Sequence, residues 1–320
     1  MSKIITVIGA TGIQGGSVIK ALQSDPTWSI RAITRNTSSD AAKTLSSQGV
    51  EVVKADLHDV NSLIAAFRGT TAIFAVTNFF ETISTLGIEK SMEVETTLGI
   101  NLAKAAAATA SLQHYIFSTL PDSKKYSGGK AIVPYYESKN NVERYIRSDL
   151  PELMEKTTFL WLGWYASNIL APPCHPSKIH SIDGTDTYVT LWSVPSTTKI
   201  PLLGDENINP GLFVRSVLSQ PEKTQKGTYV RGITRHGSIG EVVASYAEAK
   251  GIKIHYLQVS KEEYTPLWPG WGTLMDLSHS WLELTGGWPK AGTEGVVTAE
   301  ELGVEGLVST EEALKAFPLL

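Results

Sequence analysis

Residues 7–22, VIGATGIQGGSVIKAL, place four glycines between a short apolar run and the start of a helical pattern. Gly9, Gly12 and Gly15 fit G-x-x-G-x-x-G, a weak pattern alone that gains weight from its strand–turn–helix context. The first glycine permits a tight turn, the second lets the backbone approach a pyrophosphate, and the third lets the helix pack closely on the strand. The stretch therefore predicts a dinucleotide site, with phosphates held by N–H groups at the helix N-terminus. The alternative is a generic tight turn between a strand and a helix.

Composition and charge exclude several classes of partner. The 320 residues are 42% hydrophobic and 19% charged, which is ordinary for a globular protein. The net charge is −4, and no run of Lys and Arg predicts binding to nucleic acid or to an anionic membrane. No segment is apolar over a length that would span a membrane. We therefore expect a cytoplasmic protein that binds a small-molecule substrate.

Cysteine and histidine usage points away from disulfide and metal chemistry. Cys174 is the single cysteine, so an internal disulfide is excluded and a reducing compartment is indicated. His175 and His180 lie near it, but none of the seven histidines has convincing metal spacing. No metal site is expected.

Apolar, β-branched runs alternate with helical patterns through the first half of the chain. The predicted strands lie at residues 4–8, 29–34, 50–54, 71–76, 114–118 and 157–162. The predicted helices lie at residues 17–22, 40–48, 60–67, 89–109 and 138–147. Continuous apolar strands separated by helices imply a parallel sheet covered on both faces. The predicted fold class is α/β, a Rossmann-type doubly wound parallel sheet.

The pattern loosens after about residue 170. Strand-like pieces occur at residues 187–192 and 227–231, and helical patterns occur at residues 212–219, 239–249 and 309–316. We expect a dinucleotide-binding domain at residues 1–170 and a smaller α/β substrate-side domain at residues 171–320. Segments of the second half are expected to return to the main sheet.

The residues after the second predicted strand indicate which dinucleotide binds. An NAD site places an acid there for the ribose 2′-hydroxyl, whereas this chain has Arg35 followed by Asn36. A guanidinium suits a 2′-phosphate through bidentate pairing, which favours NADP(H). A solvated surface arginine is the alternative. Asp56 and Leu57 follow the third strand, where an adenine edge lies, although Asp56 also suits the start of a helix.

Several stretches together resemble the NmrA-like family, atypical members of the short-chain dehydrogenase/reductase superfamily: GATGIQGG, RAITRN, VEVVKADLHD, VPYYESKNNVERYIR and, nearer the C-terminus, YTPLWPGWGTLMDLSHSWLELTGGW and TAEELGVEGLVSTEEALKAF. The glutamine in GIQGG is the most specific local feature. The resemblance implies a Rossmann domain that prefers NADP(H), a smaller α/β domain and a cleft between them. It also implies cofactor contacts along the glycine turn and after the fourth strand, at Thr11, Ile13, Gln14, Thr77, Asn78 and Phe79. Some members are redox-sensing regulators without catalysis, and others are reductases in secondary metabolism.

Tyr135 and Lys139 form Y-x-x-x-K, the spacing that puts two side chains on one helix face. A lysine beside a tyrosine lowers the phenol pKa and can hold the nicotinamide ribose, while the tyrosine acts as a general acid. In many regulators of the family another residue replaces the tyrosine, so Tyr135 favours an enzyme. The opposing interpretations are a chance match and a Tyr135 left outside the helix by Pro134.

Further candidates follow the fifth and sixth predicted strands. Ser118 and Thr119 reach the carboxyl edge of the sheet, where either hydroxyl could bind a substrate carbonyl or merely cap its own turn. Trp164, Tyr165 and Asn168 come after the sixth strand and could contact the nicotinamide or roof the substrate, or pack as core.

Four of the eight tryptophans lie close together near the C-terminus, at positions 268, 271, 281 and 288. They predict either an aromatic wall for an apolar substrate or packing between the two domains.

Two functions from different classes follow from these features. The first is an NADP(H)-dependent reductase that acts on a carbonyl or a conjugated double bond, with catalytic residues Tyr135, Lys139, and Ser118 or Thr119. The second is a non-catalytic NADP sensor that binds a partner protein.

Overall fold

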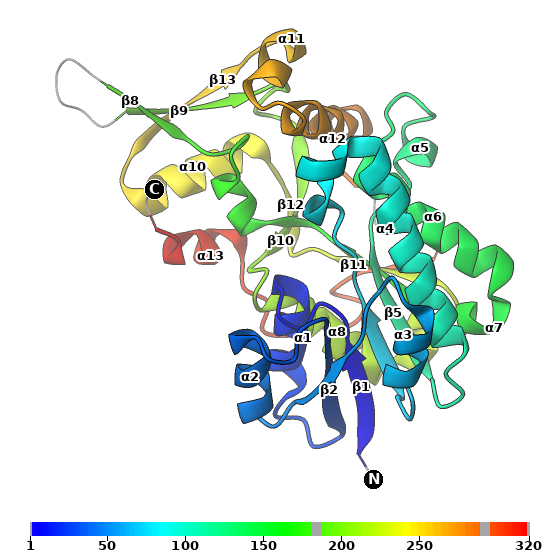
Figure 1. Ribbon diagram of the computed structural model, residues 1–320. Helices are drawn as coiled ribbons and strands as arrows, with labels where there is room; N and C mark the ends of the chain where they lie inside the picture. The colour runs from blue at the N-terminus through cyan, green and yellow to red at the C-terminus, as the bar shows by residue number, and fades with distance from the viewer. Residues whose placement is uncertain (1, 181–186, 289–294, 319–320) are drawn as a thin grey trace.

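A computed structural model describes residues 2–180, 187–288 and 295–318 (Figure 1). Its centre is an eight-stranded sheet in the order β14-β11-β6-β5-β4-β1-β2-β3, in which every pair of neighbours is parallel. The strands are β1 (Lys3–Val7), β2 (Trp28–Thr34), β3 (Glu51–Lys54), β4 (Ala72–Ala75), β5 (His114–Thr119), β6 (Thr157–Leu162), β11 (Thr228–Gly232) and β14 (Val296–Val297). The run of β3 to β6 has the strand order of a Rossmann fold. The predicted fold class is confirmed.

Helices cover both faces of the main sheet (Figure 1). Strand residues point alternately to the two faces, so neighbours on β4 enter different cores. Phe74 packs in the core that includes α1 (Ile13–Leu22) and α8 (Asn209–Ser219). Ile73 packs in the core that includes α3 (Val60–Ala66), α4 (Ile83–Ala107) and α6 (Pro134–Asp149). The continuous apolar strands are therefore explained by burial on both sides.

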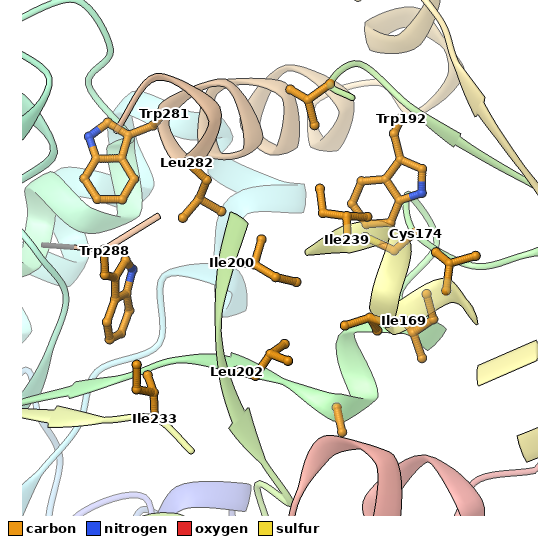
Figure 2. Close-up of a cluster of buried hydrophobic side chains, with 14 of the residues drawn as sticks. Ile169, Cys174, Trp192, Ile200, Leu202, Ile233, Ile239, Trp281, Leu282 and Trp288 are labelled. Atoms are coloured by element: carbon orange, nitrogen blue, oxygen red, sulfur yellow. The ribbon is translucent and has the colours of Figure 1, made fainter. Parts of the chain in front are cut away.

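The second half of the chain builds two three-stranded sheets, β12-β10-β7 and β13-β9-β8. Their strands are β7 (Trp164–Tyr165), β8 (Ser177–Ile179), β9 (Thr187–Trp192), β10 (Lys199–Gly204), β12 (Arg235–Ser238) and β13 (Lys253–Gln258). β11 and β14 return from this half to the main sheet beside β6. Figure 2 shows the core of this half, where β10 carries Ile200 and Leu202 among Trp192, Trp281 and Trp288.

The remaining elements cover these sheets or connect them. The helices are α2 (Asp40–Ser47), α5 (Ser123–Tyr126), α7 (Pro151–Met154), α9 (Pro221–Thr224), α10 (Ile239–Lys250), α11 (Lys261–Tyr264), α12 (Trp271–Thr285) and α13 (Thr310–Ala316). Three short 3₁₀ turns are η1 (Phe79–Glu81), η2 (Ala166–Leu170) and η3 (Thr265–Leu267). Across the part of the chain that the structure describes, no helix is both long and apolar enough to cross a membrane.

Four helices begin earlier than the sequence pattern predicts, among them α8, which starts at Asn209 rather than residue 212. α1 starts at Ile13 rather than residue 17, and α4 starts at Ile83 with a break at Gly87 (φ +74°). α6 starts at Pro134 rather than residue 138, because proline fits the first helical position, where its missing N–H is not needed. Tyr135 therefore lies inside the helix.

Close contact between α1 and α8 generates a stability prediction. An alanine Cβ at Gly211 would lie 2.1 Å from the Ser17 carbonyl oxygen and 2.7 Å from Ala21 Cβ. Since this oxygen belongs to the α1 backbone, Gly211→Ala should push α8 away and lower the free energy of unfolding by about 1–3 kcal/mol. Urea denaturation measures the change. Gly16→Ala is the control, since its Cβ would meet Ala10 O at an ordinary 3.8 Å and helix propensity favours alanine. Equal stability of the two variants would contradict the prediction.

Candidate functional site

The three glycines of the first turn occupy three different environments. Gly9 adopts φ +66°, the left-handed conformation that favours glycine. A Cβ on Gly15 would lie 2.3 Å from Gly9 O, so this glycine lets α1 pack against the turn. Gly12 is the N-cap of α1, no side chain caps that helix, and a Cβ there would meet only Gly9 O, at 3.3 Å. Exposed backbone and an uncapped helix N-terminus fit the pyrophosphate of a dinucleotide.

Gln14 links this turn to the second half of the chain. Its Nε2 donates to the Tyr165 hydroxyl at 2.6 Å, while its Oε1 is buried without a hydrogen-bond partner. Tyr165 lies on β7, and burial raises its pKa to about 12. The neighbouring predicted contacts Thr11 and Ile13 are exposed. The unpartnered amide oxygen is a second feature of this edge that suits a polar ligand.

Gly163 explains the close approach of β7 to β10. A Cβ at this position would lie 2.7 Å from Pro201 O and 2.8 Å from Ile233 Cγ2. Any larger side chain here would collide with the neighbouring strand.

Arg35 follows β2 and points along the carboxyl edge of the sheet. Its Nη2 lies 2.6 Å from Glu81 Oε1, and its side chain is 68% exposed. The other predicted contacts here are engaged locally: Asn36 Oδ1 accepts from Ser38 N, Asp56 Oδ1 accepts from His58 N, and the Leu57 carbonyl accepts from Asn101 Nδ2. The exposed guanidinium is therefore available to an anionic ligand.

Lys139 is buried in an ion pair that sequence reasoning missed. Its Nζ lies 2.7 Å from Glu95 Oε1, with the lysine side chain 11% exposed and the glutamate 1% exposed. The ammonium also donates to the carbonyl and the hydroxyl of Thr77, at 3.1 and 3.0 Å. Ser138 Oγ donates to the second carboxylate oxygen of Glu95. The only feature of the sequence that could have indicated Glu95 as the partner of Lys139 is its position as an acidic residue within the predicted helix 89–109.

Tyr135 points from α6 toward α12. Its hydroxyl is 2.7 Å from Ser278 Oγ, and its ring contacts Phe79 and Phe80 with centroids 6.1 and 5.3 Å away. Burial raises the pKa of this phenol well above 10. Tyr135 and Lys139 thus share a helix but have different polar partners.

Asn78 and Phe79 position the segment that faces Tyr135. Asn78 is the N-cap of η1, where its Oδ1 accepts from Phe80 N at 3.1 Å. Phe79 is buried against Ile83 and Leu274. Phe80 stacks on Trp271 with centroids 5.2 Å apart. An aromatic wall therefore joins η1 to the N-terminus of α12.

Ser118 and Thr119 lie side by side at the end of β5 but point to opposite faces of the sheet. Thr119 donates to the buried carboxyl of Glu143, which also accepts from Tyr229 OH at 2.6 Å. Burial raises the Glu143 pKa to about 7, although these hydrogen bonds oppose the shift. Glu143 lies four residues after Lys139, and this helical spacing is the signal from which the sequence could have predicted Glu143 as a site residue. A cavity of about 150 Å³ adjoins it, lined in part by Asn140 and Trp161.

The other aromatic candidates lie mainly in packing contacts. Trp281 donates to Ser123 O at 2.9 Å, and Trp288 packs on Trp161. Trp268 contacts Tyr264. Trp164 pairs with β10 and is half-buried, and Asn168 lies half-buried in η2.

Among the described residues, no group of three His, Cys, Asp or Glu side chains could hold a metal ion.

The buried carboxyl of Glu143 predicts a pH dependence of stability. Between its ordinary pKa of 4.5 and its folded-state pKa of about 7, the folded protein keeps the proton that the unfolded chain releases. Raising the pH through this window therefore favours unfolding. Glu143→Gln stays neutral, so its unfolding free energy relative to the unmodified protein should rise by about 1–3 kcal/mol from pH 5 to pH 8. Urea denaturation at several pH values checks this, with the exposed Glu93→Gln as the control. Parallel pH profiles for the unmodified protein and Glu143→Gln would exclude the shift.

Comparisons with known proteins agree with this arrangement. The NmrA-like family pattern matches residues 1–283. The chain is 31% identical over 278 residues to an NmrA-like family domain-containing oxidoreductase of Cladobotryum sp, covering 85% of this chain and 78% of that protein. It is 35% identical over 263 residues to another such oxidoreductase, from Aspergillus hancockii, covering 80% of this chain and 75% of that protein.

Solved structures show the same fold. The negative transcriptional regulator NmrA superposes with a TM-score of 0.76 at 22% identity, over 99% of this chain and 95% of that one. NmrA has been solved in complex with NAD and with NADP. An NADPH-dependent quinone oxidoreductase from Escherichia coli superposes with a TM-score of 0.70 at 18% identity, over 97% of this chain and 98% of that one. With the match over residues 1–283, the chain belongs to the NmrA-like family.

Proposed function

We propose that this protein is a cytoplasmic NADP(H)-dependent reductase that acts on a carbonyl or a conjugated double bond of a small molecule, in secondary metabolism. The proposal rests on one observation: the candidate cofactor-binding residues all lie at the carboxyl edge of the main sheet. The glycine turn follows β1, Arg35 follows β2, and Thr77, which binds Lys139, follows β4. Relatives named oxidoreductases, at 31% and 35% identity, support it.

The cofactor would be held by the residues along this edge. The turn at Gly9, Gly12 and Gly15 would receive the pyrophosphate, and Arg35 the 2′-phosphate. When bound, the nicotinamide supplies the hydride. Lys139 already directs its ammonium donors to Thr77 and Glu95, so it would bind a ribose hydroxyl by exchanging one of the Thr77 contacts.

Tyr135 is the proposed proton donor. Because its pKa is raised by burial, the phenol holds its proton at neutral pH. Ser278 can either donate to or accept from the phenol. When Ser278 donates, the Tyr135 proton is available to a substrate oxygen or carbon. The stacked rings of Phe80 and Trp271 would offer an apolar surface to a flat substrate.

A non-catalytic NADP sensor with a protein partner is the second candidate. The Glu95 carboxylate neutralises the ammonium that is expected to lower the Tyr135 pKa, and that pKa is instead raised. Weak acid chemistry at Tyr135 would suit a protein that binds the cofactor without turnover. NADPH consumption with a panel of ketones, aldehydes, quinones and enones separates the two functions. Turnover above background on any compound supports the reductase, and firm NADPH binding with no turnover supports the sensor.

The cofactor preference is the first prediction of this proposal. Arg35→Glu should weaken NADPH binding by roughly 1.5–3 kcal/mol, the range for one charge-assisted contact, and leave NADH binding little changed. Isothermal titration calorimetry measures both affinities. Arg68→Glu makes the same charge change at an exposed arginine just before β4, near the amino ends of the strands, and should have little effect on either affinity. Equal affinity of the unmodified protein for NADPH and NADH would contradict the proposed role of Arg35.

The proton donor is the second prediction. Tyr135→Phe should lower kcat by about 10²–10⁴ and leave NADPH affinity nearly unchanged, because the phenol acts only on the substrate. Steady-state kinetics and calorimetry measure the two quantities. Tyr145→Phe removes a hydroxyl elsewhere on α6, where the ring lies against Lys104, and should retain full activity. An undiminished kcat in Tyr135→Phe would exclude this residue as the donor.

A further inference from the structure

Arg35 has a carboxylate partner on the far side of the glycine turn. Glu81 Oε1 lies 2.6 Å from Arg35 Nη2, and the two side chains are 49% and 68% exposed. Arg35 follows β2, whereas Glu81 ends η1, which follows β4. β1 lies between β4 and β2 in the sheet, so the ion pair joins the segments on either side of the Gly9–Gly15 turn. A dinucleotide seated on that turn must share this edge with the pair.

We propose that Glu81 is a specificity-determining residue that competes with the 2′-phosphate of NADP(H) for the Arg35 guanidinium. The inference rests on the proposed dinucleotide binding. A carboxylate and a phosphate on one guanidinium repel each other, so the phosphate binds at the expense of the Glu81 contact. The NAD ribose has a neutral hydroxyl instead and does not compete. Glu81 thereby narrows the preference for NADP(H) that Arg35 alone would give.

The pair is suited to exchange because it is exposed. Forming an ion pair between side chains this exposed changes an equilibrium constant by at most about fivefold. A phosphate, which carries more charge, can therefore displace the carboxylate from Arg35. η1 does not depend on Glu81 for its position. Asn78 Oδ1 accepts from Phe80 N, and Phe80 stacks on Trp271. A substitution of Glu81 should therefore change the charge beside Arg35 and leave the segment in place.

Calorimetric titration of NADPH and NADH into the full chain tests the proposal. Glu81→Gln should tighten NADPH binding by about two- to fivefold and leave NADH binding unchanged. Glu93→Gln is the matched control, because Glu93 pairs with Lys90 at the same 2.6 Å and both side chains are 62% exposed. This control should alter neither affinity. In an Arg35→Gln background, the gain from Glu81→Gln should disappear.

Three results would overturn the role of Glu81. They are unchanged or weaker NADPH binding in Glu81→Gln, an equal gain for both dinucleotides, and a gain that persists without Arg35. Each leaves the proposed function intact as long as the unmodified protein prefers NADPH. Failure of the unmodified protein to bind either dinucleotide would instead overturn the proposed function.

Discussion

The ion pair between Lys139 and Glu95 anchors the candidate site to the fold. Both charges are removed from water, which is unfavourable by several kcal/mol per ion unless their remaining donors and acceptors are satisfied. Here Thr77 accepts from the ammonium, and Ser138 donates to the carboxylate. These contacts join the end of β4 to α4 and α6. They fix the rotation of α6 about its axis.

That rotation determines where the other polar side chains of α6 point. Tyr135, Lys139 and Glu143 are spaced four residues apart, and each step of four turns the helix by about 40° beyond a full revolution. Lys139 faces β4, so Tyr135 turns to one side, toward η1 and α12, while Glu143 turns to the other, toward β5 and β11. The Tyr–Lys spacing therefore places both residues on one broad face without bringing the phenol and the ammonium to a common partner.

The fold was largely predictable from the sequence, and the site only in part. The six strands predicted in the first half are observed within two residues at each end. Burial on both faces explains the apolar runs of the central strands β4 and β6. The glycine turn was predictable because its geometry is local. The bonds from Gln14 to Tyr165 and from Arg35 to Glu81 join residues 151 and 46 positions apart. A single sequence carries no local pattern for such contacts.

The environment of Tyr135 bears on the substrate of the proposed reductase. A general acid acts best when the group that it protonates is more basic than its own conjugate base. Because burial holds the Tyr135 pKa well above 10, its phenolate is a strong base and the phenol a weak acid. An alkoxide formed from a ketone or an aldehyde is basic enough to take this proton, whereas a hydroquinone anion is not. Under the proposed function, proton transfer from Tyr135 would therefore be most favourable toward a strongly basic oxygen such as an alkoxide.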